Sequence, residues 1–126
     1  MAGVLELDAS IMYGRTLEAG AVCAMKRYLH PISVARQVMA RLPVVMLAGE
    51  KAERFAEEIG AETAELLTEE TDAAYRWWVA EHVPEALRER WPEVNLSEYA
   101  REALDPERVG GTTCVLVKDD SGDIAA

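Results

Sequence analysis

Apolar and polar residues follow a strand pattern at the start of the chain. Between residues 4 and 11, apolar side chains largely alternate with polar ones, which predicts a strand with one buried face. Gly14 and Arg15 then predict a turn. Residues 19–25 are mostly apolar and predict a second strand. The two strands are therefore expected to form a hairpin-like pair with a longer connection.

Two helical patterns come next, with a short apolar run between them. Pro31 is suited to the first turn of a helix, and residues 32–42 carry an apolar stripe at helical spacing. His30, before this proline, is a poor cap. Residues 44–48 predict a short strand that is buried on both faces. The next helix runs over residues 52–59, and Gly60 is well placed to end it.

The second half of the chain is more polar. A helix is predicted from near Thr68 to Pro84, with an acidic first turn that suits the helix dipole. Trp77 and Trp78 cannot both face one side of it, so one is expected in a core and the other at a rim. Residues 93–110 read as an acidic surface loop. Beyond them, residues 113–126 predict a strand, a turn and a returning strand.

Composition limits the range of functions. The chain has 126 residues, of which 50% are hydrophobic and 29% charged, as in an ordinary globular protein. A net charge of −10 argues against nucleic acid or an anionic membrane as partner. No apolar run approaches the roughly 20 residues of a membrane-spanning helix. The two cysteines and two histidines are isolated, so we expect no metal site and no paired thiols.

The order of elements indicates a mixed fold. A strand-strand-helix-strand-helix sequence is not the regular alternation of a doubly wound fold. The pattern therefore supports an α/β (α+β) layered arrangement and no finer assignment.

The junction of Gly110, Gly111 and Thr112 is the feature with the most chemical content. If the Gly111–Thr112 bond were cut, Thr112 would carry a hydroxyl nucleophile and a free α-amine on one residue. The amine can serve as general base for that hydroxyl. The same residues also fit a plain loop that runs into a strand, since glycine marks turns and threonine favours strands.

Further segments match a known family in the same order. They are residues 6–22, 31–39, 47–56, the pair Gly111–Thr112, and 119–126. Together they resemble the plant-type L-asparaginase and isoaspartyl peptidase family, which belongs to the threonine-type N-terminal nucleophile hydrolases. The similarity is dense up to about Gly60, thin over residues 61–110, and resumes at Gly111.

The resemblance implies a fold and a division of the chain. The expected fold is part of the four-layer αββα sandwich of the N-terminal nucleophile hydrolases. Residues 1–111 would form part of the N-terminal (α) subunit, with 93–111 as a linker, and 112–126 would begin the C-terminal (β) subunit. The chain reads as an internal fragment, one incomplete domain, because segments that the family carries before and after it are missing. We expect this fragment to be inactive by itself.

The resemblance also implies an activity. The complete protein would cut itself between Gly111 and Thr112 and then use catalytic Thr112 to hydrolyse L-asparagine, β-aspartyl (isoaspartyl) dipeptides or both. A glycosylasparagine-type amidase and a non-catalytic interaction protein with the same sandwich stay open as alternatives. The partners implied are a small amide or dipeptide substrate and a second processed αβ unit in a homodimer. No cofactor, metal, nucleic acid or membrane is expected, the location is expected to be cytoplasmic, and no substrate-binding residue can be assigned.

Four residues depart from the family pattern. Gly110 replaces a usual His or Asp, Tyr13 replaces a usual Asp, and Thr113-Cys114 replaces a usual Val-Gly. Thr113 also offers a second hydroxyl, although the register favours Thr112. These changes predict slow processing or shifted specificity. Asp8 and Ser10, which are strong family markers, are interpreted as structural.

Overall fold

The protein is described from a computed structural model, which covers residues 4–91, 93–95, 97 and 114–126. The chain divides into two compact units. The first, Leu5–Leu66 with Thr113–Ala126, is called the sheet unit; the second, Met1–Val4 with Leu67–Thr112, is called the helical unit.

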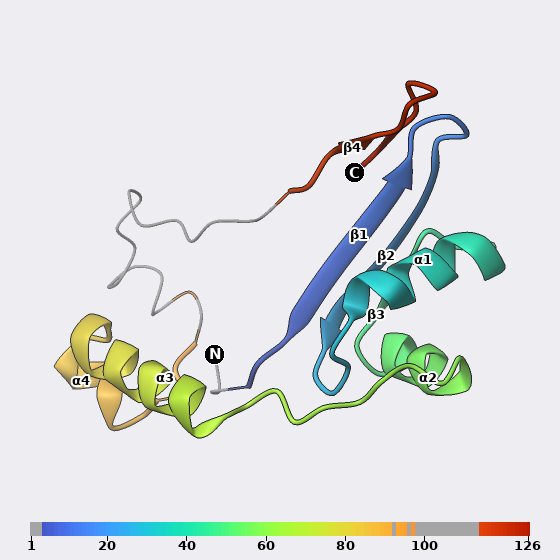
Figure 1. The fold of residues 1–126 in the computed structure, drawn as a ribbon. Coiled ribbons are helices and arrows are strands. Elements are labelled where there is room, and N and C mark those ends of the chain that lie inside the picture. Colours follow the sequence, from blue (N-terminus) through green and yellow to red (C-terminus); the bar gives the residue numbers. More distant parts are fainter. Residues whose placement is uncertain (1–3, 92, 96, 98–113) are drawn as a thin grey trace. The chain divides into compact units, whose positions relative to one another are not determined.

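The sheet unit contains a five-stranded sheet of order β3-β2-β1-β5-β4 (Figure 1). β1 and β2 are antiparallel, which confirms the predicted hairpin-like pair, and β3 runs parallel to β2. β4 and β5 form a second antiparallel pair that joins β1 through Tyr13 and Ala125. The strands are β1 (Leu7–Tyr13), β2 (Glu18–Met25), β3 (Met46–Ala48), β4 (Val117–Lys118) and β5 (Ile124–Ala125).

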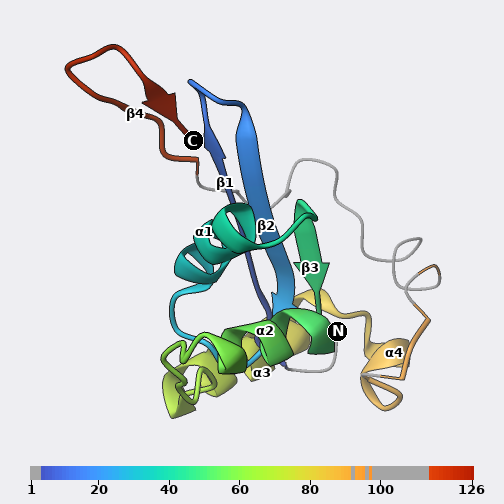
Figure 2. The same cartoon turned by 90° about the vertical axis from the view of Figure 1, so that its right-hand side faces the viewer.

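Two helices, α1 (Pro31–Arg41) and α2 (Glu50–Glu58), cover one face of this sheet (Figure 2). Both were predicted from apolar spacing. Pro31 occupies the first turn of α1, and His30 gives it no side-chain cap, as expected. Past the end of α2, Gly60 has a φ of +68°, a conformation that glycine adopts at little cost.

One core lies between these helices and the sheet. Val22 and Met25 of β2 are fully buried against Val34 and Val38 of α1 and Ala56 of α2. Burying such side chains removes apolar area from water and is worth about 2 kcal/mol for each large residue. The other buried members of the cluster are Tyr28, Ala35, Ala52 and Phe55.

Residues 44–48 were predicted to form a strand buried on both faces. The strand is present, but the predicted burial is wrong. β3 is only three residues long, and Val44, Val45 and Met46 are all exposed. Leu47 packs against the core. The reason is that β3 is the edge strand of the sheet, and helices cover one sheet face only.

The helical unit holds α3 (Glu69–His82) and the short α4 (Glu85–Arg88). Thr68 caps α3 in a reciprocal arrangement with Thr71, which gives this helix a well-defined start. A small cluster of Val83, Leu87 and Val94 is packed by neighbours that include Trp78. Trp77 is 63% exposed, so the two tryptophans divide between core and surface as predicted.

Gly20 of β2 lies directly under α1. A Cβ placed on Gly20 would collide with the Ala35 carbonyl oxygen and come 2.7 Å from the Met39 amide nitrogen. Backbone atoms of a packed helix cannot move aside without shifting the helix itself. The separation between α1 and the sheet is therefore set by the absence of a side chain at this position.

We predict that Gly20→Ala lowers the free energy of unfolding by about 3 kcal/mol, because it overpacks a rigid contact. Gly60→Ala is the matched control: it has open space around it and pays only for its positive φ, at about 1 kcal/mol. Urea denaturation followed by circular dichroism measures both. Equal losses in the two variants would contradict the close approach of α1.

Candidate functional site

Gly111 and Thr112, the predicted processing site and nucleophile, lie outside the described residues. So do Gly110, Thr113 and most of the predicted linker 93–111, of which residues 93–95 and 97 are described. The described part of the chain resumes at Cys114, two residues after Thr112. Cys114, Val115 and Leu116 are exposed, and Thr112 precedes the first residue of β4, Val117, by five residues.

The turn between β4 and β5 is built by Asp119. One of its carboxylate oxygens, Oδ1, accepts hydrogen bonds from the backbone amides of Ser121 and Asp123, both at 2.9 Å. Gly122 has a φ of +89° and donates its amide to the Asp119 carbonyl at 3.0 Å. Asp119 and Gly122 were matched to the family in the sequence, and the structure gives both a local role in closing this predicted turn.

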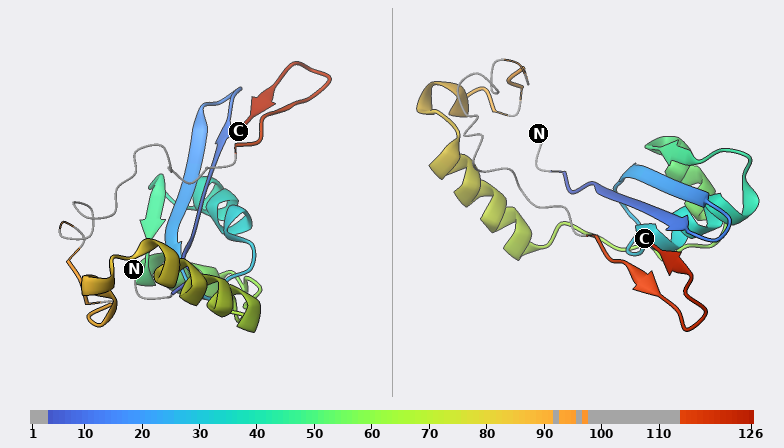
Figure 3. Two further views of the ribbon diagram at one scale, coloured as in Figure 1. Left: turned by 90° about the vertical axis from the view of Figure 1, so that its left-hand side faces the viewer. Right: turned by 90° about the horizontal axis from the view of Figure 1, so that it is seen from above.

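The β4–β5 hairpin joins the sheet at the C-terminal end of β1 (Figure 3). Met12 and Ala126 exchange backbone hydrogen bonds of 2.8 and 3.1 Å, and the Gly14 amide donates to the Ile124 carbonyl at 2.7 Å. A Cβ on Gly14 would lie 2.5 Å from that same carbonyl oxygen. Gly14 therefore permits the hairpin to approach β1 closely.

Asp123 links this hairpin to the turn between β1 and β2. Its Oδ2 atom forms an ion pair with Arg15 and accepts a hydrogen bond from the Tyr13 hydroxyl at 3.4 Å. The pKa of Arg15 is raised above its usual value, chiefly by its hydrogen bond to Asp123 and then by its charge interaction with Tyr13. Sequence reasoning noted Tyr13 as a departure from the family but did not connect it with Asp123, which is 110 residues away.

Asp8 has a structural role, as its sequence interpretation proposed. Its Oδ1 atom accepts the backbone amide of Ala24 at 2.8 Å. Ala24 has a φ of +55°, and the β1–β2 register shifts between Leu7 and Ala9. Asp8 thus satisfies a backbone donor at an irregular point of the hairpin, where the ladder does not supply an acceptor.

Glu53 of α2 is a second structural carboxylate, which sequence reasoning did not single out beyond its family match. Its Oε1 atom accepts the Lys26 amide at 2.9 Å, and Arg27 lies 3.6 Å from Oε2. The Tyr28 hydroxyl donates to the Glu53 backbone carbonyl at 3.1 Å. Glu53 therefore holds the segment after β2 against the start of α2.

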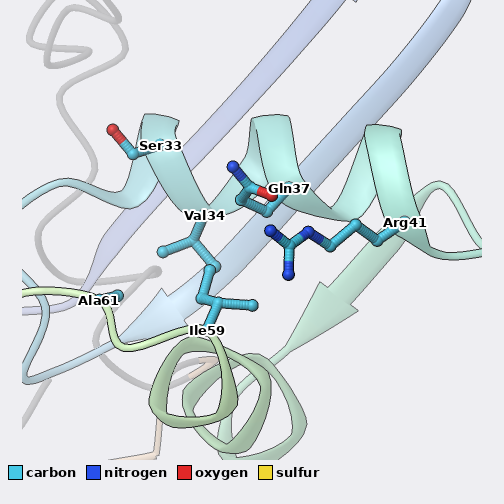
Figure 4. A pocket seen from close by; sticks show the side chains of 6 residues that line it. All are labelled: Ser33, Val34, Gln37, Arg41, Ile59 and Ala61. Atoms are coloured by element: carbon cyan, nitrogen blue, oxygen red, sulfur yellow. The ribbon is translucent and has the colours of Figure 1, made fainter.

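A shallow pocket of about 190 Å³ lies between α1 and the end of α2 (Figure 4). Ser33, Gln37 and Arg41 of α1 line it above an apolar floor of Val34, Ile59 and Ala61. It contains none of the predicted site residues. Within the ranges that the structure covers, no group of three or more His, Cys, Asp or Glu is arranged to hold a metal ion. None of the described helices is long and apolar enough to cross a bilayer.

A match to the asparaginase family extends over residues 1–126 of this chain. The chain belongs to the asparaginase family. Membership confirms the resemblance seen in the sequence. The mixed five-stranded fold also agrees with the predicted α/β (α+β) class.

Individual members of the asparaginase family are similar over much of the chain. The plant-type L-asparaginase of Pyrococcus horikoshii is 37% identical over 124 residues, 88% of this chain and 40% of the relative. The isoaspartyl peptidase of Salmonella typhimurium is 33% identical over 98% of this chain and 37% of its own length. A putative N(4)-(beta-N-acetylglucosaminyl)-L-asparaginase of Drosophila yakuba is 39% identical over 64% of this chain and 20% of its own. The chain thus spans at most about two fifths of the length of these relatives.

We predict that Asp8→Ala destabilises the protein by about 1 kcal/mol, because the Ala24 amide loses its acceptor. Asp8→Asn keeps an acceptor oxygen and should cost less. Ala24→Gly should stabilise by about 1 kcal/mol, because glycine removes the penalty of a positive φ. Thermal unfolding followed by circular dichroism ranks the stabilities of the three variants. A loss of activity in Asp8→Asn at unchanged stability would argue against a structural role.

Proposed function

We propose that the complete protein is an autoprocessing amidohydrolase that acts on L-asparagine, on β-aspartyl dipeptides, or on both. The observation that carries this proposal is the family match over residues 1–126, with relatives named plant-type L-asparaginase and isoaspartyl peptidase. The two substrate classes share one reacting group, an amide carbonyl at the β-position of an aspartyl unit. One nucleophile can therefore serve both.

The first stage is a self-cleavage at Gly111–Thr112. The Thr112 hydroxyl attacks the Gly111 carbonyl carbon and loses its proton, the C–N bond breaks, and the proton goes to the released α-amine. The resulting ester is hydrolysed by water, which leaves a carboxylate on Gly111 and restores the Thr112 hydroxyl. Residues up to Gly111 then form the α chain, and Thr112 begins the β chain. Glycine at position 111 supports this step because it tolerates the strained backbone that the attack needs.

The second stage uses the new α-amine of Thr112. The amine takes the hydroxyl proton as the oxygen attacks the substrate's β-carbonyl, and that proton passes to the departing ammonia or amine. Water then hydrolyses the acyl-enzyme ester to give aspartate and free Thr112. Backbone or side-chain donors that stabilise the oxyanion supply much of the rate in such reactions. We expect them from parts of the protein outside residues 1–126, so this chain alone should not turn over.

A second candidate is an amidase for glycosylated asparagine. The similarity to the Drosophila yakuba relative favours it, and its scissile bond is again a side-chain amide of asparagine. The two candidates differ in the size of the leaving group that the site admits. Parallel assays with asparagine, a β-aspartyl dipeptide and a glycosylated asparagine separate them, and turnover of none would favour a non-catalytic protein.

The sheet unit also supports a four-layer arrangement in the complete protein. α1 and α2 cover one face of its sheet, and on the opposite face Met12 is 48% exposed and Met46 58% exposed. The residues between them on that face are small, such as Ala21 and Ser10, which pair across β1 and β2. A face of small and apolar side chains suits a second sheet packed about 10 Å away. We propose that the rest of the protein supplies that sheet.

We predict that the complete protein converts with time into two chains, the second beginning with Thr112. Thr112→Ala should abolish both the cut and the activity, because it deletes the one hydroxyl used in both stages. Thr112→Ser keeps an oxygen and should retain slow cleavage. Thr113→Ala is the matched control and should still be cut. N-terminal sequencing of the smaller chain decides the assignment: a first residue of Thr113, or an uncut but fully active protein, would overturn it.

We also predict that Cys23 is protected from alkylation in the folded complete protein. Cys23 neighbours buried Val22 on β2, so strand alternation places it on the face opposite α1 and α2. A second sheet on that face would cover it. Iodoacetamide labelling with peptide mass spectrometry measures the rate, and the urea-unfolded protein is the control. Native labelling as fast as in urea would contradict the four-layer proposal.

A further inference from the structure

We propose that Asp123, held by Arg15 and Tyr13, is a positioning residue that fixes the β4–β5 hairpin, which follows Thr112 in the chain. The inference rests on the proposed function, because it concerns the placement of the Thr112 hydroxyl. The ion pair of Arg15 and Asp123 thereby affects processing and turnover, although neither of its residues reacts.

The hairpin after Thr112 has few attachments to the sheet. β4 and β5 pair through only two residue pairs, Val117 with Ala125 and Lys118 with Ile124. β5 in turn pairs with β1 at Tyr13, and backbone hydrogen bonds of Met12 and Gly14 lie on either side of this pair. Two-stranded hairpins of this size are marginal in water without further support. The orientation of β4 therefore depends on the contacts at the β1–β2 turn.

Asp123 connects the two turns. Its backbone closes the β4–β5 turn, since its amide donates to the Asp119 side chain and its carbonyl accepts the Asp119 amide, both at 2.9 Å. Its side chain binds Arg15 and Tyr13, which flank Gly14. The Asp123 side chain is 17% exposed and that of Arg15 58%. A carboxylate this shielded is screened less by solvent than the usual surface ion pair.

The three residues form a set in this chain. Tyr13 stands where the family resemblance leads us to expect Asp. An aspartate there would face Asp123 with like charge, whereas the tyrosine hydroxyl donates to it. Arg15 supplies the compensating charge, and Gly14 between them lets the Ile124 carbonyl approach. Three adjacent residues, Tyr13, Gly14 and Arg15, thus favour one position of the hairpin.

This position matters for the chemistry because Thr112 precedes Val117 by only five residues. We expect a tilt of the hairpin to displace the residues that precede it in the chain, Thr112 among them. A displacement of about 1 Å at a reacting group can cost about a hundredfold in rate. Loss of the ion pair should shift the hairpin by less, so we expect a loss of about tenfold.

Charge reversal and charge exchange test the proposal in the complete protein. Arg15→Asp and Asp123→Arg should each slow the appearance of the chain that begins with Thr112 by about tenfold. The exchange variant with both changes should return to within about threefold of the unaltered rate, because the pair is restored in reverse. Tyr13→Phe removes only one long hydrogen bond and should have a smaller effect. Arg76→Asp, in the Arg76–Asp72 pair on α3, is the matched control and should leave the rate unchanged.

Hydrogen exchange gives a readout that does not depend on cleavage. In a Thr112→Ala background, Asp123→Arg should speed amide exchange at Met12, Gly14 and Ala126, which carry the hairpin contacts. Exchange at Val38, which α1 buries in the core, should not change. Faster exchange at both places would show general unfolding and would overturn a positioning role.

The outcomes separate the two proposals. A normal cut at Gly111–Thr112 with unchanged rates in both charge reversals would overturn the positioning role alone. Slow single variants without recovery in the exchange variant would also overturn it, because the effect would not come from the pair. If the unaltered protein shows no cut at Gly111–Thr112, the proposed function fails, and the role of Asp123 in it fails too.

Discussion

The close contact between α1 and β2 at Gly20 is the constraint on which the rest of the sheet unit depends. Helix backbone lies where a side chain would otherwise stand, so α1 rests on the sheet at a distance that only glycine allows. At that distance Val34, Ala35 and Val38 enter the core with Val22 and become fully buried. Close packing of this kind gives dispersion contacts that a looser helix would lose.

The second helix is placed relative to this contact by polar groups. Glu53 accepts from the chain after β2, and the Gly49 amide donates to the Cys23 carbonyl at 2.9 Å. On β2 itself, the Asp8 side chain accepts a hydrogen bond from the Ala24 amide. Each bond gives a partner to a backbone group that the sheet ladder leaves without one, and so favours this arrangement of the chain. The helices are thus fixed to one face, and the opposite face of the sheet is free for the second layer that we propose.

The β4–β5 hairpin is the part of the fold that follows the proposed nucleophile, Thr112, in the chain. This hairpin is short, and its attachments are concentrated at the end of β1. The core under α1 cannot hold it, because β5 and β4 lie beyond β1 in the sheet order. Contacts around Gly14 and Asp123 hold the hairpin in place instead. The residue expected to perform the chemistry therefore precedes the part of the sheet that relies most on a few polar contacts.

Local signals in the sequence were enough for the β1–β2 pair and the helices, but they overestimated the length of β3 and β4. Apolar spacing located α1 and α2, Pro31 and Gly60 marked a start and an end, and the Asp119–Gly122 turn was read correctly, because each signal acts within a few residues. The order of motifs also identified the family. Tertiary structure alone decided the strand order, the exposure of Val44 and Val45, the contact at Gly20, and the pairing of Asp123 with Arg15. These features join segments that are distant in the chain, and periodicity reports which face of an element is apolar but not which partner covers it.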